Sequence, residues 1–453
     1  MNGTVAAIST PRGRGGVAII RISGGEAFSV AEKVFAPANS AAFAKRTRAH
    51  AYYGSFYDAS GVFDDGLCIL FGSPRSFTGE DVAELHCHGG VLCAQKLLSA
   101  VFAAGAEPAG PGEFTKRAFI NGKLTLTQAE AIGNVIDAKS ERSLGIAAKQ
   151  AGGSLSRGIA EAADELTRLA ASVYAFIDYP DEDMTDVSAD DMRRRLCEIH
   201  GKLKKLADSH RYGKAISEGI ETVITGKPNV GKSSVLNLLC GEERAIVTDI
   251  AGTTRDVVTE TVRVGDYVLR LSDTAGIRES LDAVEKLGVE RSIKAIGGAE
   301  LVLAVFDGSR PPDGDDERIV SAINAAGLSD RTICVMNKRD LAAPAFEPPF
   351  ALSAEVSALN GEGAKEIEKQ ISLLVGAASV GENDEIVLNA RQYAAIERAR
   401  RAVEDAINAL SGFTQDVAGM DIERALEALY EADGRRVGEE IVAEIFSHFC
   451  VGK

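Results

Sequence analysis

The chain has 453 residues, a length that predicts two to four domains, each large enough to bury its own core. Hydrophobic residues make up 45% and charged residues 26%, as in a soluble globular protein, and no apolar run reaches the ~20 residues that cross a bilayer. The formal net charge of −16 argues mildly against a large nucleic-acid-binding surface, although it is compatible with a local basic patch.

The cysteine pattern and the N-terminal residues predict where in the cell the protein is found. Seven scattered cysteines, without a Cys-x-x-Cys pair, predict reduced thiols. The N-terminus lacks a basic segment followed by a long apolar run, so we do not expect secretion. We therefore expect a cytoplasmic protein with no membrane segment.

The first part of the chain, residues 1–118, mixes strand and helix patterns. Residues 17–22 and 66–71 are predicted as strands and residues 91–102 as a helix, and Gly-Pro-Gly at 110–112 marks the end of this part. The pattern predicts a compact α+β domain.

Two helical segments flank a segment of alternating elements. Apolar residues recur at helical spacing in 119–215 and 377–453, whereas residues 216–376 alternate strands with helices, as a parallel doubly wound sheet requires. The simplest architecture inserts this α/β domain into one all-α helical domain formed by both flanks. Two separate bundles would give the same pattern. The predicted fold class is therefore multidomain, with an α+β N-terminal domain, a helical domain and an inserted α/β domain.

A phosphate-binding loop stands near the start of the alternating segment. Residues 226–233, Gly-Lys-Pro-Asn-Val-Gly-Lys-Ser, match the P-loop pattern and lie between a predicted strand and a predicted helix. This context directs backbone N–H groups and the helix dipole at phosphate oxygens. Lys232 would reach the β- and γ-phosphates, and the Ser233 hydroxyl would bind Mg²⁺.

Further motifs follow in the order typical of a GTPase. Thr253-Thr254 would complete the Mg²⁺ shell, and Asp273, which follows a predicted strand, would lie near the metal. In the segment 337–340, Asn-Lys-Arg-Asp, the carboxylate of Asp340 can accept hydrogen bonds from guanine N1–H and the 2-amino group, a donor pair that adenine lacks. Ser353-Ala354, after another short strand, completes the predicted base pocket. The series predicts a P-loop GTPase domain.

Outside this domain, distinctive motifs run from the first predicted strand to the last residue, in segments 15–24, 76–81, 111–115, 117–124, 128–131 and 449–453. These segments resemble one family, the tRNA-modification GTPases called MnmE or TrmE. Val451 replaces the usual Ile, and Val91 stands where Pro often follows His-Gly-Gly. Residues 432–436 depart more, and we assign them no function.

The resemblance implies a GTP-hydrolysing subunit of a complex that modifies C5 of the tRNA wobble uridine by aminomethyl or carboxymethylaminomethyl addition. It implies a cytoplasmic homodimer that joins an FAD-containing partner of the GidA or MnmG type in a heterotetramer, with tRNA as substrate. The one-carbon unit would come from a 5-formyl or methylene tetrahydrofolate, bound by the N-terminal domain, which also dimerises.

The residue that orients the attacking water differs from that of most small GTPases. They have Gln directly after Asp-x-x-Gly to orient the attacking water, but this chain has Ile277, which cannot hydrogen-bond water. The resemblance implies that Glu285 takes the role. Without the resemblance, a solvated glutamate at a helix start is the better interpretation of Glu285.

No arginine finger can be assigned from the sequence, and the resemblance implies a K⁺ ion and dimerisation of the GTPase domains instead. For Asn229 alone, a turn-forming role is an equal alternative. The implied Mg²⁺ ligands are Ser233 and Thr254, and the implied K⁺ ligands are Asn229, Thr248, Ile250 and Thr253. Together the motifs and the resemblance give these GTP-binding residues: Asn229, Val230, Gly231, Lys232, Ser233, Ser234, Thr248, Asp249, Ile250, Ala251, Gly252, Thr253, Thr254, Asp273, Thr274, Ala275, Gly276, Asn337, Lys338, Asp340, Ser353 and Ala354.

A folate site needs a carboxylate for the donor edge of the pterin and cations for the glutamyl tail. Matched family positions supply Arg21, Glu84, Lys123 and Lys453, each of which alone is more often a surface charge. Cys450, near the folate-binding C-terminal segment of the chain, is either a reactive thiol or a packing residue.

Two other clusters have simpler interpretations. His86-Cys87-His88 with Cys93 could suggest a metal site, but no second pair at ligand spacing accompanies it, so packing or backbone roles are favoured. The basic run 193–195, with Lys202, Lys204 and Lys205, could touch RNA, but a solvated helix face is the better interpretation. A different class of function, a ribosome-assembly or other RNA-associated regulatory GTPase switch, would be favoured by an appended RNA-binding module, which the sequence does not reveal.

Overall fold

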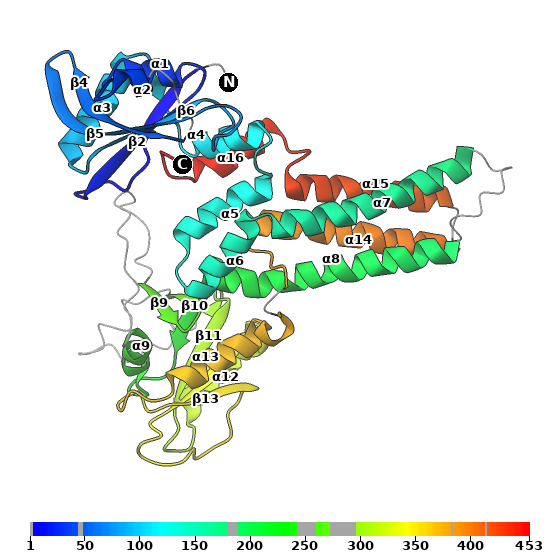
Figure 1. The fold of residues 1–453 in the computed structure, drawn as a ribbon. Helices are drawn as coiled ribbons and strands as arrows, with labels where there is room; N and C mark the ends of the chain where they lie inside the picture. The colour runs from blue at the N-terminus through cyan, green and yellow to red at the C-terminus, as the bar shows by residue number, and fades with distance from the viewer. Residues whose placement is uncertain are drawn as a thin grey trace. The chain divides into compact units, whose positions relative to one another are not determined.

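The computed structural model describes residues 3–43, 49–178, 189–241, 260–271, 296–381, 384–412 and 415–453. The chain forms two compact units (Figure 1). The first unit comprises Met1–Gly133, Ala151–Ser156 and Tyr430–Lys453, and the second comprises Asn134–Gln150 and Arg157–Leu429. The first unit therefore combines both ends of the sequence.

The first unit is built on a seven-stranded sheet. All neighbouring strands pair antiparallel except β1 and β7, which are parallel. Alternation along β6 buries Ala83, Leu85 and Cys87 on one face and leaves Glu84 and His86 half-buried on the other, which is the period of two expected for a strand. In sheet order the strands are β3 (Phe35–Pro37), β4 (Ala51–Asp58), β5 (Gly61–Phe71), β6 (Val82–His88), β2 (Val17–Ser23), β1 (Val5–Ile8) and β7 (Glu107–Pro108).

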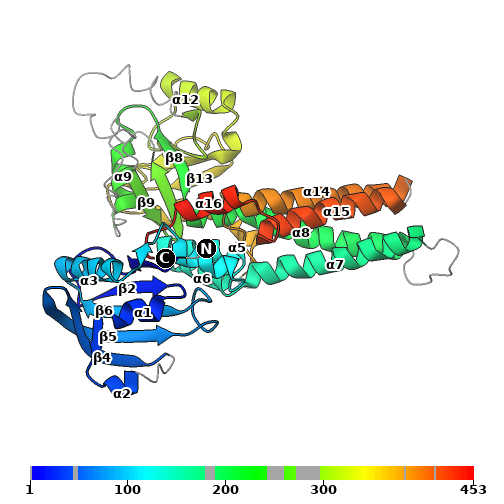
Figure 2. The same ribbon diagram turned by 90° about the horizontal axis from the view of Figure 1, so that it is seen from above.

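Helices α1 (Ala27–Glu32) and α3 (Val91–Ala103) cover one face of this sheet (Figure 2). Leu97 and Val101 of α3 are buried against strand residues such as Ile20, in one hydrophobic core. The short helix α2 (Ser40–Phe43) adds Phe43 to the same core. On the other face, Phe114 of α4 (Glu113–Ile120) is buried against Val5 and Ala7 of β1, whereas Tyr53 of β4 and Leu67 of β5 are exposed.

The end of the chain completes the first unit. Helices α4 (Glu113–Ile120), α5 (Leu126–Asp137) and α16 (Glu439–Ser447) meet there, with Leu126 and Phe446 in one buried cluster. Beyond α16, Val451 forms an antiparallel bridge with Pro111. Gly112 has a φ of 60° and lies against the backbone of Phe446, so a side chain at this position would be strained and would also collide.

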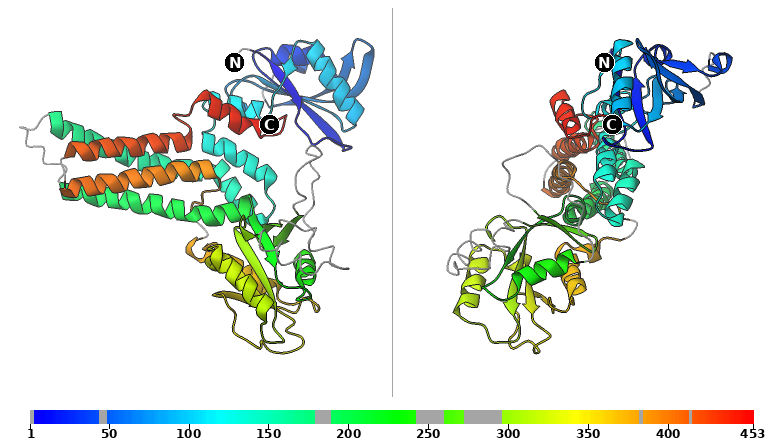
Figure 3. Two further views of the ribbon diagram at one scale, coloured as in Figure 1. Left: turned by 180° about the vertical axis from the view of Figure 1, so that it is seen from behind. Right: turned by 90° about the vertical axis from the view of Figure 1, so that its left-hand side faces the viewer.

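Long helices form one part of the second unit (Figures 1 and 3). They lie side by side in every view, and His210 of α8 stacks on Tyr393 of α14 with ring centroids 4.5 Å apart. The long helices are α7 (Ser154–Asp178), α8 (Ala189–Ser217), α14 (Ala390–Gly412) and α15 (Gln415–Asp433), and the shorter α6 (Glu141–Ala151) precedes them in the chain.

The other part of the second unit is a doubly wound sheet inserted between α8 and α14. Its order is β13 (Leu352–Glu355), β12 (Thr332–Asn337), β11 (Leu301–Asp307), β8 (Ile220–Thr225), β10 (Tyr267–Leu271) and β9 (Glu260–Val264), and only β9 runs antiparallel. Successive residues of β11 enter two different cores, which shows that both faces are covered. Helices α9 (Lys232–Cys240) and α13 (Ala364–Leu374) pack into one core and α12 (Gly314–Ala325) into the other.

The predicted fold class is confirmed: an α+β N-terminal part, a helical part and an inserted α/β P-loop domain are all present. The structure places the predicted strand 66–71 within β5, and α3 begins at the predicted Val91. The domain boundaries at 118, 215 and 376 stay a prediction. In the part of the chain that the structure describes, no helix is both long enough and apolar enough to cross a membrane.

Candidate functional site

The P-loop connects β8 to α9 at the carboxyl edge of the sheet. Gly226 and Gly231 have φ values of 152° and 97°, and a Cβ at either would collide, with the Val305 carbonyl and the Asn337 amide respectively. Glycine is therefore required at both positions. Helix α9 begins at Lys232, so its first N–H groups point into the loop.

The charged and polar P-loop residues occupy different environments. Lys232 donates from Nζ to the carbonyl oxygens of Gly226 and Lys227, each 2.9 Å away, and burial lowers the pKa of its ammonium. Asn229 is exposed at the tip of the loop in a left-handed conformation, with φ of 64°. Val230 is buried, Ser233 is half-buried in the first turn of α9, and Ser234 is exposed.

The predicted base-recognition segment follows β12 and contacts the P-loop. Asn337 is buried, donates from Nδ2 to the Val230 carbonyl at 2.9 Å, and accepts at Oδ1 from the Ala358 N–H at 3.1 Å. Asp340 is exposed, and its Oδ1 accepts a hydrogen bond from the Ser357 hydroxyl at 2.6 Å. These contacts bring the P-loop, the 337–340 segment and the loop after β13 together.

The structure does not bring Ser353 and Ala354 to this pocket. Both lie inside β13, where they pair with Cys334 and Val335 of β12, and Ala354 is buried. Because β13 extends to Glu355, the loop that reaches Asn337 and Asp340 begins at Val356. It carries a second Ser-Ala pair, Ser357-Ala358, four residues after the first. The turn-forming Asn360-Gly361 after the second pair was the sequence signal that favours it.

Asp307, at the end of β11, is a functional candidate that the motifs did not reveal. Its Oδ2 accepts hydrogen bonds from Lys338 Nζ at 2.7 Å and pairs with Arg310 Nε at 3.1 Å. Burial opposes its ionisation, but the bonds from Lys338 and Ser309 outweigh burial and lower the pKa of Asp307. The carboxylate therefore holds Lys338, whose backbone is left-handed with φ of 69°, in place beside the base-recognition segment.

A buried lysine, Lys227, ties the P-loop to α12. Lys227 Nζ lies 2.6 Å from Asp313 Oδ2 and 2.5 Å from Asp316 Oδ2. Burial alone would lower the pKa of Lys227, but its two carboxylate partners raise it above the ordinary value. Asp313 and Asp316 also form the capping box of α12, so one cluster fixes both the loop and the helix start.

Several predicted residues lie outside the described residues. These are Thr248, Asp249, Ile250, Ala251, Gly252, Thr253, Thr254, Asp273, Thr274, Ala275, Gly276 and Glu285, together with Ile277. The predicted catalytic group, three of the four K⁺ ligands and one Mg²⁺ ligand therefore stay predictions.

In the first unit, Arg21 and Glu84 form an ion pair across neighbouring strands. They are register partners on β2 and β6, and Arg21 Nε and Nη2 each lie 2.9 Å from Glu84 Oε1. The guanidinium also lies over the rings of Phe77 and Phe114, at 5.6 and 5.5 Å from their centroids. His86, whose Nε2 is 3.5 Å from Oε2, and Arg21 lower the pKa of Glu84 against the opposing effect of burial.

The other predicted folate positions adjoin this pair through intervening residues. The Phe114 N–H donates to the Lys453 carbonyl at 3.0 Å, so the C-terminal residue lies beside the ring that contacts Arg21. Lys123 donates from Nζ to the Pro74 carbonyl at 3.1 Å, on the loop that carries Phe77. Cys450 is exposed, and its carbonyl accepts from the Gly112 N–H at 3.3 Å.

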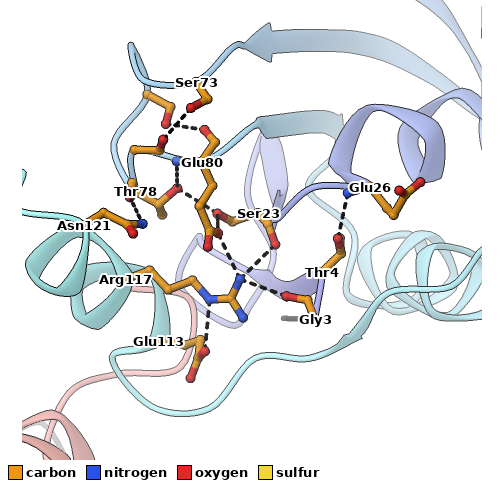
Figure 4. Close-up of polar contacts among 12 residues, drawn as sticks. Gly3, Thr4, Ser23, Glu26, Ser73, Thr78, Glu80, Glu113, Arg117 and Asn121 are labelled. Atoms are coloured by element: carbon orange, nitrogen blue, oxygen red, sulfur yellow. Dashed lines mark hydrogen bonds and ion pairs between the residues drawn. The ribbon is translucent and has the colours of Figure 1, made fainter. Parts of the chain in front are cut away.

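A buried arginine fixes that loop to α4 (Figure 4). Arg117 donates from Nε to Glu113 at 3.0 Å, and from Nη1 to Glu80 and to the Gly3 carbonyl, each at 2.9 Å. Ser23 also donates to Glu80, at 2.8 Å. Arg117 is therefore a structural centre that positions the Phe77 loop, which the motif alone did not indicate.

The P-loop, the Asn-Lys-x-Asp segment and the mostly parallel sheet that carries them define a P-loop GTPase domain. The sequence model of the MnmE helical domain matches residues 126–450, and the model described as GTP-binding protein TrmE N-terminus matches residues 4–123. The tRNA modification GTPases MnmE of Clostridioides difficile and Acetivibrio thermocellus are 39% and 40% identical to this chain, each over 99% of both sequences. The chain therefore belongs to the MnmE family of tRNA modification GTPases. Membership confirms the resemblance and the predicted class of enzyme, a GTPase.

Proposed function

We propose that the protein hydrolyses GTP to drive modification of C5 of the tRNA wobble uridine, by aminomethyl or carboxymethylaminomethyl addition. The observation that supports this best is the presence of two different polar sites in one chain. The second unit carries the P-loop and base-recognition residues, and the first carries the Arg21–Glu84 pair beside two aromatic rings. A GTPase acting only as a switch would need no second site of this kind.

The nucleotide site suits guanine and Mg²⁺. Asp340 is exposed and oriented by Ser357, so a carboxylate oxygen can accept from the donor edge of guanine. Ser233 in the first turn of α9 and Thr254 would hold Mg²⁺, which neutralises phosphate charge when bound. Asn229 at the loop tip would supply an amide oxygen to K⁺, together with Thr248, Ile250 and Thr253. Glu285 orients the attacking water in this proposal.

The Arg21–Glu84 pair suits a tetrahydrofolate. Arg21 uses Oε1 of Glu84, so Oε2 retains capacity to accept from the N–H groups of a pterin. Phe77 is partly exposed, and its ring can stack on a flat heterocycle. Lys123 and Lys453 would pair with the glutamyl carboxylates. A 5-formyl or methylene derivative would supply the one-carbon unit, and Cys450 would lie near it.

The protein acts in the cytoplasm in this proposal, as a homodimer with an FAD-containing GidA or MnmG-type partner in a heterotetramer, and tRNA is its substrate. The face of the first-unit sheet opposite α1 and α3 carries exposed apolar residues, among them Val17, Tyr53 and Leu67. These residues support dimerisation through the first unit.

Mass spectrometry of tRNA nucleosides tests the proposal. A deletion strain should lose the modified wobble uridine and regain it with the wild-type gene but not with Lys232→Ala. Glu366→Ala, which changes an exposed acid in α13, is the matched control and should restore the modification. Unchanged nucleosides in the deletion strain, or co-purification with a ribosomal particle in place of a flavoprotein, would contradict the proposal.

A further inference from the structure

Three metal-ligating side chains from three elements meet in the first unit. Asp64 comes from β5, Cys87 from β6 and Cys93 from the first turn of α3. A carboxylate oxygen of Asp64 and the Sγ atoms of both cysteines all lie within 4.8 Å of one another. The cluster lies on the helix-covered face of the sheet, away from the Arg21–Glu84 pair, which is on the other face.

The contacts within this cluster already arrange the ligand atoms. Cys93 Sγ donates to Asp64 Oδ2 at 3.0 Å, and the other oxygen, Oδ1, lies 2.7 Å from His88 Nδ1. The His88 N–H also donates to Oδ2 at 2.9 Å. Cys87 is buried and Cys93 is half-buried, while the Asp64 side chain is 10% and the His88 side chain 69% exposed. The site is therefore enclosed on one side and accessible from solvent on the other.

We propose that Asp64, Cys87 and Cys93 bind a Zn²⁺ ion, with His88 positioning Asp64 and water in the fourth position. A set of two thiolates and one carboxylate suits Zn²⁺, whereas Mg²⁺ takes oxygen ligands and would not use the two thiolates. Zn–S bonds of about 2.3 Å place tetrahedral ligands roughly 3.8 Å apart. Ligand atoms within 4.8 Å need to approach by about 1 Å at most, which side-chain rotation can supply.

Sequence spacing raises Cys87 and Cys93 as possible metal ligands but favours packing roles for them, and it does not indicate Asp64. Cys87 and Cys93 are a single pair, and the third ligand comes from a strand that pairing of β5 with β6 brings alongside. The nearby cation Lys96 is engaged elsewhere, since it pairs with Asp58 at 3.3 Å and lies over Phe63. Bound Zn²⁺ would fasten the start of α3 to the sheet. We therefore expect it to stabilise the first unit without changing the rate of GTP hydrolysis.

Cobalt binding tests the site directly. The full chain, reduced, free of metal and without a histidine tag, is titrated with Co²⁺ in excess Mg²⁺ and GDP, which occupy the nucleotide site. We expect one equivalent to give a thiolate-to-cobalt charge-transfer band and tetrahedral visible bands, both abolished by one equivalent of Zn²⁺. Zn²⁺ should also raise the thermal midpoint of the first transition.

Variants identify the ligands. Cys93→Ala should weaken metal binding at least tenfold and remove the stabilisation, with GTP hydrolysis unchanged and an unchanged far-ultraviolet circular dichroism spectrum of the metal-free chain as evidence of folding. Asp64→Asn should weaken binding while leaving the charge-transfer band, because the thiolates remain. Cys197→Ala, which changes an exposed cysteine of α8, is the control and should behave as wild type. A wild-type chain without the band, or a band undiminished in Cys93→Ala, would overturn the proposal and leave Asp64 as a cap of the turn before α3.

Discussion

The Ser357 hydroxyl donates to Oδ1 of Asp340 at 2.6 Å, so the loop after β13 orients the carboxylate that is expected to select guanine. Asp340→Asn replaces one of the two carboxylate oxygens, which accept hydrogen bonds from guanine, by an NH₂ group, which can only donate. A hydrogen bond to a charged group contributes about 1.5–3 kcal/mol. We expect guanine-nucleotide affinity to fall roughly tenfold or more, with a shift toward xanthine nucleotides, measured by displacement of a fluorescent GDP. Ser357→Ala should lower affinity less, because the carboxylate remains.

Asp330→Asn, which changes an exposed acid of the same domain, is the control for both variants. Equal hydrolysis of ATP and GTP by the wild-type protein would contradict the assignment of Asp340 to guanine.

Hydrolysis should be slow in Na⁺ and faster in K⁺. Asn229 is exposed at the P-loop tip in a left-handed conformation, which suits an amide ligand. Rates are measured in each chloride salt at matched ionic strength. Asn229→Ala should remove the response to K⁺ more than it weakens nucleotide binding, and Asn237→Ala, exposed on α9, should not. Indifference of the wild type to the cation would refute the K⁺ site but not the GTPase assignment.

Glu285→Ala should lower kcat by one to several orders of magnitude while nucleotide affinity barely changes, because Ile277 cannot position the attacking water. Each ~1.4 kcal/mol of barrier is a factor of ten in rate. Single-turnover hydrolysis in K⁺ measures the effect, with Glu366→Ala as control. Near-normal turnover of Glu285→Gln would indicate that the side chain positions the attacking water. Loss of hydrolysis in both Glu285→Ala and Glu285→Gln would indicate that it acts as a base or through its charge. Undiminished hydrolysis by Glu285→Ala would exclude the residue.

Glu84→Gln should weaken binding of 5-formyltetrahydrofolate, because the amide cannot accept from the pterin with the strength of a carboxylate. The pKa of Glu84 is lowered, so the carboxylate stays ionised at and above the ordinary range of glutamate. The affinity difference between wild type and variant should therefore be constant from about pH 8 to pH 5 and vanish only below it. Calorimetry measures it, with Glu107→Gln on β7 as control. Equal affinities at pH 7 would remove Glu84 from the site.

The same depressed pKa has a consequence for stability. The ion pair of Glu84 with Arg21 contributes fully above the unfolded-state pKa and is lost as the pH falls through the lower folded-state pKa. Acid unfolding of Glu84→Gln should accordingly be less steep than that of the wild type at the low end of the transition.

Local patterns predicted much of the fold and the P-loop, because each is decided by neighbours in the sequence. Gly226, Gly231 and Lys232 could be assigned since strand, loop and helix follow one another within a few residues. The sequence predicts Ser353-Ala354 in the base pocket, but the structure brings Ser357-Ala358 there, because the end of β13 is set by pairing with β12 and is not visible in the sequence of β13 itself.

Local sequence patterns do not predict contacts between segments that lie far apart in the chain. The meeting of Asp307 with Lys338 depends on the order of β11 and β12, and that of Asp64 with Cys93 depends on the pairing of β5 with β6. Arg117 is similar: its position on α4 was visible, but its burial among Glu80, Glu113 and Gly3 was not. Tertiary packing decides such roles.

The pairing of the last residues with the segment after β7 bears on how the protein is made. Pro111 and Phe114 leave the ribosome early, but their partners Val451 and Lys453 are translated only after the whole second unit. Bringing such distant segments together carries a large loop-closure cost in an open chain. Folding of the intervening residues into the second unit shortens that loop. The first unit therefore begins to fold early in synthesis but is completed last. Until Val451 and Lys453 have been translated, the surface around Pro111 and Phe114 lacks its partners and needs protection from aggregation.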